Sequence, residues 1–277
     1  MRARLIALII VAGGWEIAAR ADWLSATVLP PFSSVLVSLV RQLGQHNTWY
    51  QAYVSAWAIV VGFAIGTAAG LLFAATTTVI RALWTASEPV LYYLSSLPKI
   101  IFFPVLLLYL STGIFSKVGM GAVSAFFPVA ITAAQALHEV PQVQLRAARS
   151  LGAGRRKLLT HVYLPAAAGP VLSGLRLGLA VAVTGVLLAE TSVASAGLGW
   201  QAMQDYDNLR ITDMYALLLF VFFAATAINA GVGRLIRYLT RYNQATATRL
   251  GGDDRLQPGA PLGGGERLRG VRERSTR

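Results

Sequence analysis

The chain has 277 residues, of which 55% are hydrophobic and 13% are charged. An average soluble domain carries about 25% charged residues, so this composition leaves too little polar surface for a water-soluble enzyme and excludes disordered and fibrous proteins. Cysteine is absent, which excludes disulfides and thiolate metal sites, and none of the three histidines lies four residues from another, so no helical metal pair is predicted.

Six apolar segments are candidates for membrane-spanning helices, which need about 20 mostly apolar residues. They are Leu5–Ala19, Val54–Thr77, Pro89–Leu110, Val118–Leu137, Ala166–Ala189 and Met214–Gly233. For the first segment a signal peptide is the alternative, although no small-residue cleavage site follows it. Because a helix satisfies its own backbone hydrogen bonds in lipid, the sequence predicts an all-α membrane protein with about six transmembrane helices.

A proline-containing segment follows the first of these spans. Pro30 and Pro31 stop a helix, and Ser33 or Ser34 is suited to cap the next one. The amphipathic stretch Val35–Leu43 is therefore predicted to form a short helix near the membrane interface.

The last part of the chain, 249–277, is rich in glycine, arginine and proline. It cannot bury enough apolar surface to offset the entropy of ordering. We therefore predict a disordered basic cytoplasmic tail after a transmembrane domain over 1–248.

Lysine and arginine are distributed unevenly about the predicted spans. With the N-terminus in the cytoplasm, 18 of the 24 fall on the cytoplasmic side and four on the outer side, and Lys99 and Arg176 lie within spans. Leaving out the tail beyond Arg249 still gives 12 against 4. Because cytoplasmic loops carry the excess of positive charge, both termini are predicted to be cytoplasmic, and the net charge of +12 indicates orientation, not nucleic-acid binding.

The polar stretch 138–165, between the fourth and fifth spans, is predicted to contain two short helices. Pro141 is suited to the start of the first, since its missing N–H costs nothing there. Gly152 is suited to end it with a positive φ. A second helix is expected from Gly154 to Tyr163, with Leu164-Pro165 breaking it before the fifth span.

The first of these two helices has a small surface. Ala147 and Ala148, with the terminating glycine, let another backbone come close, Leu151 extends the helix, and Arg146 and Arg149 flank this surface. A helix of this kind docks into a groove of a partner. The alternative is a basic loop that rests on anionic membrane lipid.

Three charged residues fall in or at the ends of spans, namely Lys99, Arg176 and Glu190. Charges within a membrane are candidates for a substrate path. The alternative for the two cations is that their long side chains reach the headgroups, and for Glu190 that it simply meets the interface.

Gly62, Gly66 and Gly70 put small residues on one face of the second span. In lipid this pattern favours close helix contact. The contact is either internal packing or the seam of a homodimer.

Several segments of the chain resemble the motifs of a known family. Arg146-Ala147-Ala148, Gly152 and Leu164-Pro165 look like the EAA…G…LP motif of binding-protein-dependent ABC transporter permeases. Further segments resemble, in order, the branch of nitrate, sulfonate and taurine permeases: Trp15-Glu16-Ile17-Ala18-Ala19-Arg20, Leu29-Pro30-Pro31, Gly62, Gly66 and Gly70, Leu97-Pro98-Lys99, Phe126-Phe127-Pro128, Gly174-Leu175-Arg176, Ala189-Glu190 and Gly197-Leu198-Gly199. The resemblance covers roughly residues 10–240.

In that family the loop is a coupling helix that docks into a cleft of the ATPase subunit. The resemblance therefore implies that ATPase docking involves Arg146, Ala147, Ala148, Arg149, Leu151, Gly152 and Pro165. Arg146 stands where the family usually has a glutamate, so any salt bridge from that glutamate is lost. Docking is then expected to rest on Ala147, Ala148 and Gly152.

The resemblance implies a type I ABC importer permease that is not itself an enzyme. It would form a homodimer in the inner membrane of a prokaryote, with a partner ATPase that binds the ATP and an extracytoplasmic substrate-binding protein. The substrate would be a small solute, such as an alkanesulfonate, taurine or nitrate, or another small organic molecule. Consistent with this, the chain has no Gly-x-x-x-x-Gly-Lys-Ser/Thr sequence, and we predict no cofactor, metal or catalytic residue in it.

Two other functions compete with this one. A self-sufficient secondary transporter or channel predicts paired intramembrane charges or two broken repeats, and the sequence has no clear sign of either. A membrane-embedded enzyme predicts a nucleophile and base at comparable depth, and the sequence offers no such serine–histidine arrangement.

Overall fold

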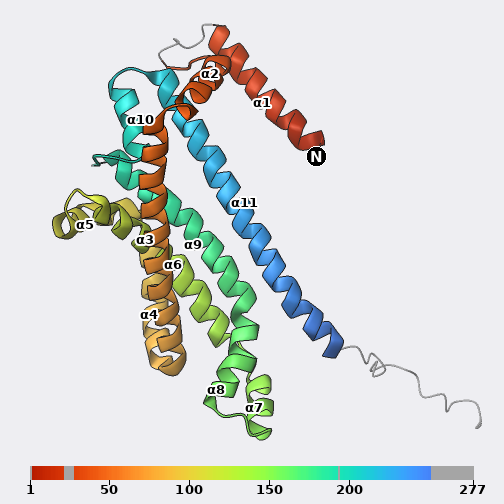
Figure 1. The fold of residues 1–277 in the computed structure, drawn as a ribbon. Helices are drawn as coiled ribbons and strands as arrows, with labels where there is room; N and C mark the ends of the chain where they lie inside the picture. The colour runs from red at the N-terminus through yellow and green to blue at the C-terminus, as the bar shows by residue number, and fades with distance from the viewer. Residues whose placement is uncertain (1, 22–27, 193, 251–277) are drawn as a thin grey trace, which may run out of the picture. The chain divides into compact units, whose positions relative to one another are not determined.

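The computed structural model describes residues 2–21, 28–192 and 194–250, and all regular secondary structure within these ranges is helical (Figure 1). In chain order the elements are α1 (Arg2–Arg20), α2 (Phe32–Leu43), α3 (His46–Val79), α4 (Arg81–Ser96), η1 (Lys99–Phe102), α5 (Phe103–Leu110), α6 (Ile114–His138), α7 (Gln142–Ser150), α8 (Arg155–Leu158), η2 (Leu159–Tyr163), α9 (Leu164–Ser192), α10 (Leu198–Asp207) and α11 (Ile211–Leu250). The chain divides into two compact units, Met1–Arg237 and Tyr238–Arg277, and every contact given below lies within the first. The predicted tail, 249–277, lies outside the described residues except for the last two residues of α11.

Helices α3, α6 and α9 form the centre of the first unit, with α6 in the middle (Figure 1). Glycines face α6 from both sides: Gly62, Gly66 and Gly70 from α3, and Gly178 from α9. A Cβ atom on Gly62 would lie 2.7 Å from the carbonyl oxygen of Val118, so only glycine allows these backbones to approach so closely. Such approach drives helix association in lipid. The glycine triple is therefore an internal seam.

The third predicted span, Pro89–Leu110, is wrong as a single helix. The chain bends by 98° between α4 and the η1–α5 segment. The break falls at Leu97-Pro98, where Leu97 is extended with a ψ of 142°. Proline disfavours the helical conformation in the residue before it and has no N–H to continue the helix. Residues 81–110 therefore form a bent pair, as a broken span or a re-entrant loop does.

Among the described residues, four helices are long and apolar enough to cross a membrane, and five if the bent pair counts as one span. The four are His46–Val79, Ile114–His138, Arg156–Ser192 and Ile211–Arg234, which match the second, fourth, fifth and sixth predicted spans. Helix α1 covers the first predicted span, but it carries arginines in its first turn and Glu16 and Arg20 near its end. The all-α membrane architecture is confirmed, whereas the count of six spans is not.

Glu16 fixes the corner between α1 and α2. Its carboxylate accepts hydrogen bonds from the Ser33 backbone N–H (3.0 Å), from the Ser33 hydroxyl (2.9 Å) and from Arg20 Nε (2.7 Å). The Trp15 indole N–H donates to the Pro30 carbonyl at 3.0 Å. The segments around Trp15-Glu16 and Pro30-Pro31 are thus joined by hydrogen bonds that hold the corner between α1 and α2.

The predicted short helix is confirmed as α2, but it begins at Phe32, three residues before Val35, and its place at the membrane interface stays a prediction. Its N-cap residue is Pro31, and no side chain caps it. The expected serine cap is therefore wrong, since Ser33 binds the α1 carboxylate instead.

Candidate functional sites at the two ends of the helical core

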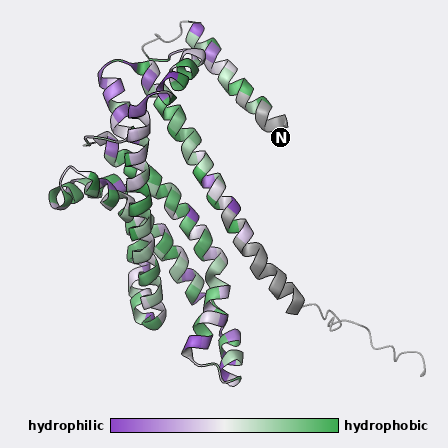
Figure 2. Cartoon of the chain, viewed as in Figure 1, coloured by the Kyte–Doolittle hydropathy of each residue, from purple (hydrophilic) through white to green (hydrophobic). Residues whose placement is uncertain are grey.

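Hydrophilic residues gather at both ends of the α3–α6–α9 core (Figure 2). At one end α7 and α8 lie beside the start of α9, and at the other α2 and α10 lie beside the start of α3 and the end of α9 (Figure 1). Polar recognition needs polar side chains at a surface, so these two ends hold the candidate sites.

Helix α7 begins directly after Pro141 and ends at Ser150, where the left-handed Gly152 two residues later terminates it as predicted. Gly152 has a φ of +77°, and its N–H donates to the Arg149 carbonyl at 2.9 Å. The Ala153 N–H donates to the Ala148 carbonyl at 3.0 Å. This pair of bonds around a left-handed residue is the Schellman motif, which terminates a helix sharply. Helix α7 is therefore a separate nine-residue unit with a defined end.

Helix α7 has one inward and one outward face. Leu145 is buried and, together with the partly buried Ala148, belongs to a small apolar cluster with Leu158 of α8. The outward face is exposed and consists of Val143, Arg146, Ala147, Arg149 and Leu151. The structure thus separates Ala147 from Ala148, because successive residues on a helix point about 100° apart.

The predicted helix break at Leu164-Pro165 is wrong. The chain from Arg156 to Ser192 forms one continuous helical run of 37 residues. Within it η2 is a wider π-type turn, in which the Leu164 N–H reaches back to the Leu159 carbonyl. In a regular helix a proline ring clashes with the carbonyl four residues earlier, and the widened turn just before Pro165 relieves this clash.

At the opposite end, Glu190 of α9 is buried, with 1% of its surface exposed. Each of its carboxylate oxygens lies 2.8 Å from the Ser55 hydroxyl on α3, and one accepts a hydrogen bond from the Gly199 N–H at 3.0 Å. Glu190 therefore ties α3, α9 and the start of α10 together. The contacts given by the structure are internal to the chain, and a role in the substrate path stays a prediction.

The loop before α10 completes this arrangement. The Gly197 N–H donates to Gln51 Oε1 at 2.7 Å, and the Leu198 N–H donates to the Ser55 hydroxyl at 2.8 Å. Gly197 has a φ of +110°, and a Cβ atom there would collide with the Glu190 carboxylate. Lys117, one of the four cations counted on the outer side, is 3% exposed on α6, and its ammonium donates to the carbonyl of Ala196, the residue before Gly197.

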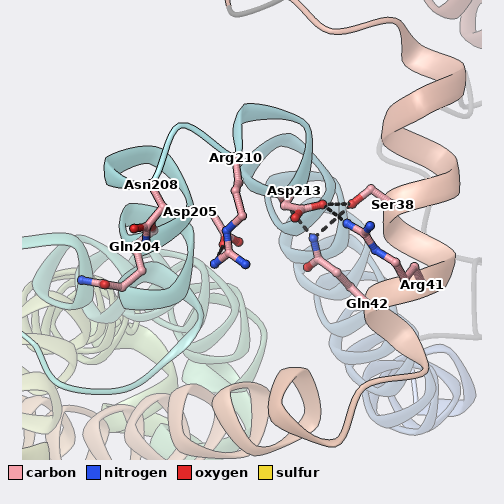
Figure 3. Close-up of polar contacts among 8 residues, drawn as sticks. All are labelled: Ser38, Arg41, Gln42, Gln204, Asp205, Asn208, Arg210 and Asp213. Atoms are coloured by element: carbon pink, nitrogen blue, oxygen red, sulfur yellow. Dashed lines mark hydrogen bonds and ion pairs between the residues drawn. The ribbon is translucent and has the colours of Figure 1, made fainter.

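A second polar cluster lies where α2, α10 and the start of α11 meet (Figure 3). Arg41 pairs with Asp213, and Arg210 pairs with Asp205 at 2.5 Å. The Ser38 hydroxyl also donates to Asp213 at 2.5 Å. The two ion pairs border a cavity of about 540 Å³. Burial raises the pKa of the Asp205 carboxyl above its ordinary value of 3.8, which the Arg210 guanidinium only partly offsets.

The other two charged candidates lie away from this cluster. Lys99 follows the break after α4, where its ammonium donates to the Ser95 carbonyl and lies 5.9 Å from the ring centre of Phe127. Arg176 is exposed on α9, and its Nε donates to Asn229 Oδ1 on α11 at 2.8 Å. Arg176 and Asn229 border a cavity of about 390 Å³ between α9 and α11, which Lys99 does not line. The structure therefore does not bring Lys99, Arg176 and Glu190 together.

The residues that sequence reasoning missed are polar partners from distant segments. Gln51 and Ser55 lie four residues apart, so they share a helix face, and this spacing could have indicated a polar contact there. Asn229 is a single amide in an apolar helix, which is a weaker indication of such a contact. Their partners are identifiable only once the helices are packed.

Comparison with known proteins gives consistent relatives. The chain is 28% identical to the taurine transport system permease protein TauC of Escherichia coli K12, over 83% of this chain and 85% of that protein. It is 25% identical to the putative aliphatic sulfonates transport permease protein SsuC of the same organism, over 83% and 88%. It is 23% identical to the nitrate import permease protein NrtB of Synechocystis, over 62% of each chain.

An inward-facing structure of the MetNI methionine ABC transporter shares the fold. It has a TM-score of 0.57 and 23% identity, over 73% of this chain and 96% of that one. Residues 66–242 match the family model described as binding-protein-dependent transport system inner membrane component, which is more than half of the chain. The chain therefore belongs to this family, the inner-membrane permease subunits of ABC importers.

Proposed function

We propose that this chain forms the membrane path of an importer for a small sulfonate-type solute or nitrate, as one half of a homodimer. A partner ATPase docks on the outward face of α7, binds the ATP and drives transport, and this chain needs no cofactor of its own. The taurine, sulfonate and nitrate permeases among the relatives support the substrate class.

The observation that carries the docking proposal is the outward face of α7. Leu151 is 87% exposed and Val143 is 68% exposed, and arginines flank them on the same surface. Exposed apolar side chains on a short helix with a fixed end suit insertion into a groove. Arg146 and Arg149 lie beside these apolar side chains and favour a groove lined by acidic residues. Docking into such a groove does not require the glutamate that other members of the family carry at the position of Arg146.

In this proposal α7 and both termini face the cytoplasm, as the charge distribution predicts. A substrate-binding protein then delivers solute at the opposite end, where α10 lies. Movement of α7 is passed through α8 and η2 into α9. Arg176 and Asn229, which border the cavity between α9 and α11, offer a positively charged position for an anion on the path.

The test is reconstitution of the chain with its ATPase and binding protein in liposomes. We expect Leu151→Asp to abolish both co-purification of the ATPase and ATP-dependent taurine uptake. The matched control is Gln142→Asp, which adds the same charge at an exposed position on the opposite side of α7 from Leu151. Uptake that persists without ATP would instead favour a secondary transporter, and normal ATPase binding by the Leu151 variant would refute docking on this face.

A further inference from the structure

Three adjoining cavities form a groove between α9 and α11. The apolar cavity of about 450 Å³ beside α10 shares Ala225 and Ile228 with a middle cavity of about 200 Å³. The middle cavity in turn shares Ala180 and Asn229 with the cavity of about 390 Å³ that Arg176 borders. The groove is open along its side, because Phe222 and Ile228 in its wall are 61% and 45% exposed. A molecule within the membrane can therefore enter it laterally.

The two ends of the groove differ in polarity. Beside α10 its wall is apolar except for Ser55, whose hydroxyl is already hydrogen-bonded to Glu190. At the other end the exposed Arg176 lies across α11, where a Cβ atom on Gly233 would be only 3.3 Å from the central carbon of the guanidinium. Its Nε donates to Asn229, and a guanidinium carries five N–H donors, so the terminal donors remain for an anion.

The length of the groove identifies the kind of molecule that fits it. Its wall on α9 extends from Arg176 to Leu187, which is about 16 Å at 1.5 Å per residue. The hydrocarbon core of a bilayer is about 30 Å thick, so one leaflet contributes about 15 Å. An apolar groove of this length with a cation at one end matches an acyl chain that carries an acidic headgroup. Nitrate or a small sulfonate would fill only a fraction of it.

We propose that the groove between α9 and α11 binds an anionic phospholipid, with one acyl chain along its apolar part and the phosphate on the guanidinium of Arg176. The phosphate then lies toward the α7 end, where the charge distribution predicts the cytoplasm. One guanidinium cannot hold a lipid phosphate and a transported anion together, so the lipid occupies Arg176 while no solute is on the path. The lipid site stands on the groove and does not rest on the proposed function.

The test is native mass spectrometry of the purified full-length chain in detergent, titrated with three probes. Phosphatidylglycerol carries both the acyl chains and the phosphate, diacylglycerol lacks the phosphate, and glycerol phosphate lacks the acyl chains. Because the phosphate adds charge-assisted hydrogen bonds, we expect phosphatidylglycerol to bind about tenfold more tightly than diacylglycerol. Glycerol phosphate is expected not to displace it. Equal affinity for the two lipids, or displacement by glycerol phosphate, would overturn the proposal.

Paired variants locate the bound lipid in the groove. Ala225→Trp places a large ring in the wall that two of the cavities share, whereas Ala227→Trp makes the same change at an exposed position of α11 that borders none of the three. We expect Ala225→Trp to weaken phosphatidylglycerol binding about tenfold and Ala227→Trp to leave it unchanged. If Ala225→Trp instead separates a dimer and leaves lipid binding intact, the groove belongs to a second copy of the chain and the proposal is overturned.

A second pair tests the headgroup. Arg176→Gln should abolish the preference for phosphatidylglycerol over diacylglycerol, while Arg81→Gln, which removes the same charge at an exposed position of α4, should preserve it. A preference that survives in Arg176→Gln refutes the assignment of the phosphate to this arginine. The assay contains neither the ATPase nor the binding protein, so failure of the transport proposal leaves these outcomes unchanged.

Discussion

Replacing the glycines of the α3–α6 seam with alanine tests how the core is held together. A Cβ atom on Gly62 would lie 2.7 Å from the Val118 carbonyl oxygen, and has to recede by about 0.3 Å to reach the 3.0 Å that real contacts respect. On Gly70 the nearest atom is at 3.0 Å, and on Gly66 the backbone of Ala122 is closer than in either case. Because the obstacles at Gly62 and Gly66 are backbone atoms, the helices themselves have to separate.

Overpacking of this kind costs about 1–3 kcal/mol. We therefore expect Gly70→Ala near the lower end, Gly62→Ala higher and Gly66→Ala highest, with melting temperatures lower by about 2–12 °C. Intrinsic tryptophan fluorescence of the purified chain during heating measures this. Gly231→Ala is the control, since nothing lies within 4 Å of its Cβ position. Equal stability of Gly66→Ala and Gly231→Ala would show that this seam does not hold the core.

Three further changes probe the two ends of the core. Glu190→Gln should lower the free energy of unfolding by about 1–3 kcal/mol, since a carboxylate that accepts buried hydrogen bonds is lost, whereas Glu139→Gln, at an exposed position, should leave the melting temperature unchanged. Because burial raises the pKa of Asp205, the folded chain holds that proton more tightly, so the contribution of Asp205 to stability should rise as pH falls toward 3.8. Thermal melts across pH should therefore show the unmodified chain gaining stability relative to Asp205→Asn as pH falls, and a difference that does not change with pH contradicts the assignment. Gly152→Ala should cost about 1–2 kcal/mol from its positive φ alone and speed amide exchange of α7 roughly five- to thirty-fold; an equal effect of Gly154→Ala, which also has open space, would contradict this.

The sequence was sufficient to predict those features that depend only on residues close together in the chain. The long apolar runs predicted the positions of four spans, because hydrophobic length alone decides whether a helix can cross a bilayer. Pro141 and Gly152 predicted both ends of α7, since each residue acts through its own backbone. The glycine triple predicted a close helix contact, although only the packed structure identified α6 as the partner.

Signals failed where the outcome depends on the surroundings. Leu97-Pro98 and Leu164-Pro165 look alike in sequence, yet the first breaks the chain by 98° and the second sits in a continuous helix. The difference is the π-type turn before Pro165, and no single residue in the sequence predicts that turn. Likewise, Ser55 and Glu190 are 135 residues apart, so their hydrogen bonds become predictable only after α3 and α9 are placed side by side.

The helical run from Arg156 to Ser192 is continuous, whereas the sequence predicted a loop that ends at Pro165 and a separate span after it. At 1.5 Å per residue, its 37 residues extend about 55 Å. The first tip of this run, its N-terminal end, packs against α7 through the apolar cluster. The other tip is hydrogen-bonded through Glu190 to α3 and α10. The π-type turn and Pro170 are the two places where this run is expected to bend, so a displacement of the first tip is divided between bending there and rotation of the other tip.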